Sequence, residues 1–202
     1  MIVYVETNFI LELAYLRSTS DNCQRLIGLA RDKRISLIVP SFALVEARMA
    51  WQNVVRRRNR LHSEVRVELA ELARSRPLVS IGEQSQSFVA ALVDTAQEDR
   101  ARLESTLDVL VTHATVLTID ARAVSNAFLV ESQLGLSPQD ALVYSAVTAH
   151  LSTAGKEPKI FVTQNARDFF IPTVEQELNS YGCKLLTNFE AAEAFVLNEI
   201  SG

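Results

Sequence analysis

Short apolar runs alternate with longer amphipathic stretches along the whole chain. The runs are rich in branched aliphatic residues, as buried strands are, and they lie at residues 2–5, 36–39, 115–119, 159–163 and 184–187. The stretches between them place apolar residues three and four positions apart, which predicts helices with one buried face. Strands that alternate with helices in this way predict an α/β fold with a mainly parallel sheet.

Residues with special backbone preferences mark where the helices begin and end. Thr7 or Asn8 caps a helix predicted at residues 9–17, and Ser137 followed by Pro138 begins another. Pro77 ends a long helix predicted from residue 41 to about 74, and residues 78–81 then form either a strand or a packed linker. A second long helix is predicted at about 85–113. We therefore expect a single domain, residues 1–202, with a helical insertion at about 48–113.

Length and composition are those of an ordinary soluble domain. The chain has 202 residues, of which 48% are hydrophobic and 22% are charged. No apolar run approaches the roughly 20 residues that span a bilayer, and the N-terminus has neither a basic segment nor a cleavage site. Cys23 and Cys183 stand far apart and form no CxxC pair, so neither a zinc site nor a disulfide framework is predicted. We expect a cytoplasmic protein with no membrane association.

Charge is distributed unevenly along the chain. The formal net charge is −4, yet residues 48–76 hold eight arginines against three glutamates. One interpretation is a nucleic-acid-binding segment in which phosphates are contacted by Arg56, Arg57, Arg58 and Arg60. The other interpretation is a solvated helix face whose charges pair along the helix. The sequence alone leaves both open.

Four acidic residues stand where a parallel sheet places a ligand site, beyond the carboxyl ends of its strands. Glu6 directly follows the first strand, and Asp168 follows the strand that ends at residue 163. Glu46 lies in the helix after the second strand, and Asp140 lies in the first turn of its own helix. Capping of a helix or turn is the structural alternative for Glu6, Asp140 and Asp168. Glu46 is surrounded in the sequence by apolar residues, and burial of an unpaired carboxylate among them would cost free energy.

The joint pattern of these acids predicts a bound cation. Four carboxylates brought together repel one another unless a cation neutralises them. Oxygen ligands without histidine or cysteine favour the hard cations Mg²⁺ and Mn²⁺. Such ions serve phosphoryl chemistry, because they activate water and stabilise the departing oxygen. The sequence therefore predicts a Mg²⁺ or Mn²⁺ site formed by Glu6, Glu46, Asp140 and Asp168.

Several stretches of the sequence resemble the motifs of PIN-domain ribonucleases. VETN at residues 5–8 resembles the hydrophobic–Asp–Thr–Asn opening, and Glu46 stands in the place of the second acid. SPQDALVYSA at 137–146 resembles the helix of the third acid, and VTQNARDF at 162–169 resembles the Thr–x–Asn–x–x–Asp–Phe closing motif. The order and the strand–helix context agree with that family over nearly the whole chain. The closing motif is the most specific of these pieces.

This resemblance implies the architecture, the reaction and the roles of the residues. A PIN-like fold has three layers, with the central sheet flanked by helices, and this chain would add a long helical insertion. The implied reaction is endonucleolytic hydrolysis of RNA that leaves 5′-phosphate and 3′-hydroxyl ends. The implied catalytic metal ligands are Glu6, Glu46, Asp140 and Asp168, and the residues that would orient them are Asn8, Thr163 and Asn165.

The sequence departs from the family pattern at two places. The first acid is Glu6, where the family usually has aspartate, and the spacing from Glu46 to Asp140 is longer than in the compact toxin-like members. The first departure favours the alternative of a catalytically weak PIN-like module that binds RNA or a protein. The second indicates a different partner or substrate surface. Candidate partners are RNA, an antitoxin-like protein if the chain is the toxin of a toxin–antitoxin pair, and a second copy in a homodimer.

Overall fold

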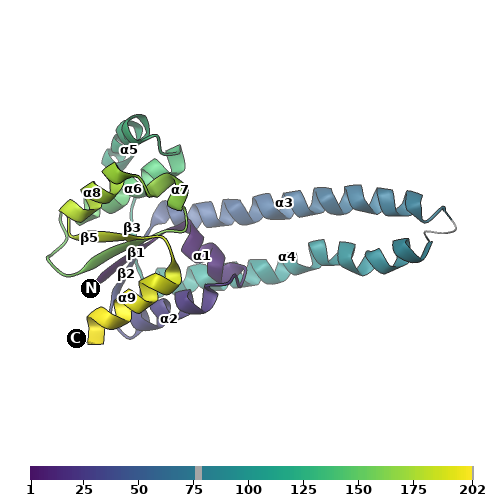
Figure 1. The fold of residues 1–202 in the computed structure, drawn as a ribbon, viewed down its shortest axis with the longest axis horizontal. Coiled ribbons are helices and arrows are strands. Elements are labelled where there is room, and N and C mark those ends of the chain that lie inside the picture. Colours follow the sequence, from purple (N-terminus) through teal and green to yellow (C-terminus); the bar gives the residue numbers. More distant parts are fainter. Residues whose placement is uncertain (76–78, 202) are drawn as a thin grey trace. The chain divides into compact units, whose positions relative to one another are not determined.

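The structure is a computed structural model that describes residues 1–75 and 79–201, without the side chains of residues 79–84, 86, 167 and 168. Two compact units are present along the chain (Figure 1). One consists of Met1–Ala47 together with Leu103–Gly202, and the other is Arg48–Arg102. The second unit falls within the insertion that the sequence predicts at about 48–113.

The first unit is built on a parallel five-stranded sheet with the strand order β3-β2-β1-β4-β5. Its strands are β1 (Ile2–Val5), β2 (Ser36–Pro40), β3 (Thr115–Leu117), β4 (Lys159–Val162) and β5 (Cys183–Leu186). Fully buried β1 pairs with β2 on one side and with β4 on the other, with Val5 beside Val162. The strand order reverses at β1, and parallel sheets bind ligands outside such a reversal point. Glu6 and Thr163, which follow these two strands, stand there.

Helices cover both faces of the sheet, which completes three layers (Figure 1). One layer contains α1 (Thr7–Ala14), α2 (Ser20–Arg31) and α9 (Phe189–Ser201), and the other contains α5 (Ala121–Leu134), α6 (Pro138–Leu151) and α8 (Pro172–Ser180). Alternate residues of β1 face the two layers, so that Ile2 and Tyr4 join the core under α5, α6 and α8. The α/β fold with a parallel sheet predicted from the sequence is confirmed.

The aromatic core fixes the segment that follows β4. A short helix, α7 (Ala166–Phe169), ends in Phe169, which is 1% exposed. The Phe169 ring lies edge-on to Phe161 of β4, with centroids 5.3 Å apart, and 6.3 Å from the ring of Tyr144 on α6. Burial of a phenylalanine side chain contributes about 1.5–3 kcal/mol. The closing motif is therefore anchored to the sheet through its last residue.

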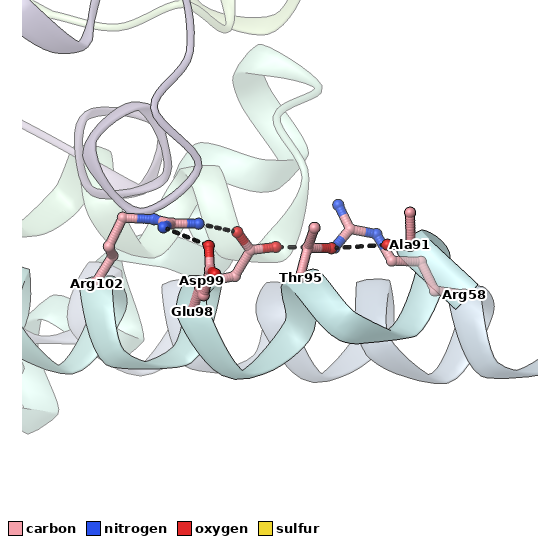
Figure 2. Close-up of polar contacts among 6 residues, drawn as sticks. All are labelled: Arg58, Ala91, Thr95, Glu98, Asp99 and Arg102. Carbon is pink, nitrogen blue, oxygen red and sulfur yellow. Dashed lines mark hydrogen bonds and ion pairs between the residues drawn. The ribbon is translucent and has the colours of Figure 1, made fainter. Parts of the chain in front are cut away.

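The second unit is a helical hairpin. Its two helices are parts of α3 (Ser41–Leu72) and α4 (Val79–His113). Between them Asp99 is 5% exposed and accepts from Arg58 of α3 at 2.8 Å and from Arg102 of α4 at 2.5 Å (Figure 2). Arg58 also donates to the Thr95 hydroxyl at 3.1 Å. A buried carboxylate requires such compensation, so this cluster joins the two helices at one register.

Two local predictions need correction. Val79–Ile81 belong to α4, so the strand or packed linker predicted at residues 78–81 is wrong for this part; Leu78 lies outside the described residues. A strand needs a neighbouring strand to satisfy its backbone, and the described residues of this unit offer only helices. The helix predicted at residues 9–17 is α1, Thr7–Ala14, and its cap is Glu6 rather than Thr7 or Asn8. The glutamate side chain is long enough to reach the Asn8 amide.

Candidate active site at the carboxyl end of the sheet

Glu6 lies between β1 and α1 and is 6% exposed. Its backbone is extended, and its Oε2 accepts from the Asn8 amide at 2.8 Å. The second oxygen, Oε1, is buried, and no described residue hydrogen-bonds to it. Burial raises the pKa of Glu6 to about 7, polar groups of Asn8 and Thr163 act in the opposite direction, and the charge of Glu46 adds to the increase. One carboxylate oxygen thus serves the fold, and the other has unused acceptor capacity.

Glu46 lies on the second turn of α3, within the first unit, and is half-buried. The Thr7 hydroxyl at the start of α1 donates to Glu46 Oε2 and so joins the helix after β1 to the helix after β2. Burial raises the pKa of Glu46, the hydrogen bond from Thr7 lowers it, and the charge of Asp140 raises it. Repulsion between carboxylates therefore links Glu46 to Asp140 and Glu6 to Glu46.

Asp140 lies in the first turn of α6, after Ser137 at the N-cap and a proline at the first helical position. The Ser137 hydroxyl accepts from the Asp140 amide at 3.1 Å and donates to Asp140 Oδ2 at 2.6 Å. The predicted capping by Ser137 is confirmed, but the carboxylate bonds to the hydroxyl and not, as a capping box requires, to the Ser137 amide. Asn165 Nδ2 lies 3.2 Å from Oδ1 and 3.3 Å from Oδ2.

The loop after β4 connects these acids. Thr163 is fully buried, and its hydroxyl accepts from the Asn165 amide at 2.9 Å. The loop thus presents Thr163 toward Glu6 and Asn165 toward Asp140. Asn8, Thr163 and Asn165, which the resemblance implies as orienting residues, all contact or influence one of the predicted acids. Their role in catalysis stays a prediction.

Asp168 belongs to α7, one residue before the buried Phe169. Its side chain lies outside the described part of the chain, so its predicted place as fourth ligand remains a prediction. The backbone of α7 follows the loop that holds Asn165, whose side chain contacts Asp140.

The chemistry of this donor set fits a divalent cation. Across the described side chains, no three histidine, cysteine, aspartate or glutamate groups are placed closely enough to hold a metal ion as they stand, and Asp168 is outside that comparison. Yet Glu6 carries a buried oxygen without a partner among the described residues, the charge of Glu46 raises the pKa of Glu6, and the charge of Asp140 raises the pKa of Glu46. A cation would relieve both the desolvation and the repulsion, which hydrogen bonds here offset only in part.

The four arginines of the predicted phosphate-binding segment have different surroundings. Arg58 is bound to the buried Asp99 and is held within the hairpin. Arg56 donates to Asn53 at 2.5 Å, and Arg60 lies 4.0 Å from Glu64. Arg57 is exposed, and the described residues offer it neither a hydrogen bond nor an ion pair. Arg58 therefore has a structural partner, whereas the other three face solvent.

Some polar partners of the site were not predicted from the sequence. The contact of Thr7 with Glu46 joins residues 39 apart, and Gln164 Nε2 contacts Thr19, 145 residues away, at 3.2 Å. Gln164 lies inside the closing motif at a position that the motif leaves variable. No local pattern indicated either contact, because each depends on which helix the topology brings next to which strand end.

A family profile that matches most of the chain identifies the family. The sequence profile of the PIN domain matches residues 3–169, which include all four predicted acids and the closing motif. This protein belongs to the PIN-domain family, whose members are in general nucleases. Among curated proteins, no sequence match to the chain was found.

One of the solved structures that match this chain is a complex. It is the crystal structure of VapBC2 from Rickettsia felis bound to a DNA fragment from their promoter, with a TM-score of 0.44 and 16% sequence identity. The alignment covers 92% of this chain and 97% of that chain.

None of the helices in the described residues is long and apolar enough to cross a membrane.

Proposed function

We propose that this protein is a Mg²⁺- or Mn²⁺-dependent endoribonuclease whose metal ligands are Glu6, Glu46, Asp140 and Asp168. The observation that carries the proposal is the linked set of acids at the reversal point of the sheet. Glu6 has a buried oxygen without a partner there, and Glu46 and Asp140 raise the pKa of neighbouring acids. Membership of the PIN-domain family supports the same reading.

The chain's own residues would bind and orient the acids for this reaction. Asn165 and Ser137 donate to Asp140, Thr7 donates to Glu46, and the Asn8 amide fixes one oxygen of Glu6. A divalent cation in the site would supply activation of water and neutralisation of charge at the phosphate. Loss of a donor that holds a metal-binding carboxylate in place typically lowers metal affinity or activity by about 10- to 100-fold.

The direct test is cleavage of RNA by the purified protein. Single-stranded and structured RNA should be cleaved internally in Mn²⁺ or Mg²⁺, with 5′-phosphate and 3′-hydroxyl ends, and EDTA should stop the reaction. Undiminished cleavage in EDTA would mean a contaminant or another mechanism. RNA binding without cleavage in either metal would favour the second candidate, a catalytically weak PIN-like module. The glutamate at position 6 favours that candidate, because its Oε2 is already committed to capping α1.

The proposed setting is a toxin–antitoxin pair, in which an antitoxin-like protein binds the nuclease. Expression of the chain alone should then arrest growth, and co-expression of a small protein encoded beside its gene should restore it. Growth unaffected by an active nuclease would remove the toxin role and leave the nuclease.

Arg57 and Arg58 should respond differently to substitution by glutamine. Loss of the exposed Arg57 should weaken RNA binding and lower the slope of log affinity against log salt by about one. Loss of Arg58 leaves Asp99 with Arg102 alone and should lower the free energy of unfolding by about 1–3 kcal/mol. Fluorescence anisotropy with labelled RNA at several salt concentrations, and urea denaturation, measure the two effects. An unchanged salt slope in Arg57→Gln would identify this surface as a solvated helix face or a protein-binding face.

A further inference from the structure

Gln164 stands between the two loop residues that contact the predicted acids. Thr163 precedes it and stands beside Glu6, one residue beyond the paired Val5 and Val162, and Asn165 follows it and donates to Asp140. The Gln164 side chain is half-buried and donates from Nε2 to the Thr19 hydroxyl at 3.2 Å. The loop is thereby joined to the turn between α1 and α2.

Thr19 uses its hydroxyl in an unusual way for its position. It is the residue before α2, where threonine commonly caps the helix, yet its side chain makes no cap. The hydroxyl instead donates to Glu12 Oε2 at 2.6 Å while it accepts from Gln164, and the Thr19 amide donates to the same oxygen at 3.1 Å. The donors run in one direction, from Gln164 through Thr19 to Glu12, and such chains polarise and strengthen their members.

Glu12 anchors this chain inside α1. It is 3% exposed, and a carboxylate at that depth needs several donors. Thr19 serves Oε2 twice, and Arg17 Nη1 lies 3.8 Å from the other oxygen, with its guanidinium 5.1 Å from the centre of the Tyr15 ring. Arg17 therefore contacts Glu12 without taking part in the link to Gln164, which makes it a matched control.

We propose that Thr19 is a positioning residue for the metal site: its hydroxyl, anchored on Glu12, holds Gln164 and with it the loop that orients Glu6 and Asp140. The inference rests on the proposed function for its consequence in metal binding. The alternative is that Glu12 and Thr19 only stabilise the turn between α1 and α2. In that case, loss of the Thr19 hydroxyl would leave the conformation of the loop after β4 unchanged.

Thr19→Val removes the hydroxyl and keeps the shape, and Thr19→Ser keeps the hydroxyl. We expect Thr19→Val to weaken Mn²⁺ binding, measured by titration calorimetry, by about tenfold. It should also speed hydrogen exchange of the Asn165 amide, which donates to Thr163 in the native loop. Thr19→Ser and Arg17→Ala should match the wild type in both readouts.

Gln164→Leu breaks the same chain from the loop side and leaves Glu12 and Thr19 untouched, so it serves if Thr19→Val fails to fold. It should reproduce the weaker Mn²⁺ binding and the faster exchange. Wild-type exchange at Asn165 in both Thr19→Val and Gln164→Leu would overturn the inference. If the wild type binds Mn²⁺ but cleaves no RNA, the proposed function fails and the positioning role is still decided by these variants. If it binds no Mn²⁺, the positioning role at a metal site is overturned, and exchange at Asn165 shows only whether Thr19 holds the loop.

Discussion

Asp140→Asn is expected to lower the rate of RNA cleavage by at least about a hundredfold while the fold stays intact. Asparagine has the size of aspartate, and its oxygen still accepts from the Ser137 hydroxyl and from Asn165. It lacks the negative charge that the site requires to hold a cation, and small errors in the placement of reacting groups already cost on the order of a hundredfold. Initial rates of cleavage in saturating Mn²⁺, with thermal unfolding as the check on the fold, measure the effect.

Asp120→Asn is the matched control for this variant. Asp120 also follows a strand, but it caps α5 by accepting from the Ala123 amide at 2.8 Å. Asparagine caps helices about as well as aspartate. The control should therefore keep both its stability and its activity. Full activity in Asp140→Asn, or an equal loss in Asp120→Asn, would remove Asp140 from the catalytic site.

Glu6 should make the metal-free protein lose stability as the pH rises from about 4.5 to about 7, and Glu6→Gln should remove that contribution. The folded protein holds the Glu6 proton up to a pKa of about 7, whereas the unfolded chain releases it near 4.5. The folded state therefore binds the extra proton within this window, and rising pH removes the stability that this proton contributes. The full effect is at most about 3 kcal/mol, at about 1.4 kcal/mol per pKa unit.

Glutamine at position 6 carries no charge to bury, and its oxygen can still accept from the Asn8 amide. In EDTA, the free energy of unfolding from urea titrations at pH 5 and pH 8 should differ by less in Glu6→Gln than in the wild type. Glu46, whose pKa is also raised, contributes a decrease of the same sign in both proteins. A wild-type pH dependence in Glu6→Gln would show that the Glu6 carboxyl is not buried as described.

Most of the fold was predictable because it depends on local pattern. The runs of branched apolar residues became the five strands, and the central strands β1 and β4 are buried along their whole length, as strands inside a parallel sheet usually are. Asp120 and Gly135 bound α5 as their backbone preferences indicate, with Gly135 at a φ of 68°. A short apolar run does not by itself distinguish a strand from a helix. The run at residues 78–81 predicted a strand or a packed linker, but residues 79–81 form the start of α4.

The acids of the proposed site could be named from the sequence, but their hydrogen-bond partners could not. Glu6, Glu46 and Asp140 could be proposed because they follow predicted strands or lie in the family motifs, and both features can be recognised from the sequence alone. Which donor meets which acid depends on side chains far apart in sequence, as with Asn165 and Asp140, 25 residues apart. Arg58 shows the same limit. Its charge predicted a phosphate contact, whereas the hairpin pairs it with Asp99, 41 residues away.

In the proposed site, Glu6, Glu46, Asp140 and Asp168 converge on one divalent cation. Anomalous diffraction from a crystal soaked in Mn²⁺ tests this convergence most directly, because the scattering identifies the ion and its ligands together. We expect a manganese peak at the carboxyl ends of β1 and β4, within coordination distance of Asp140, Asp168 and at least one of Glu6 and Glu46. A peak bound by other residues, or no peak there at saturating Mn²⁺, would contradict it.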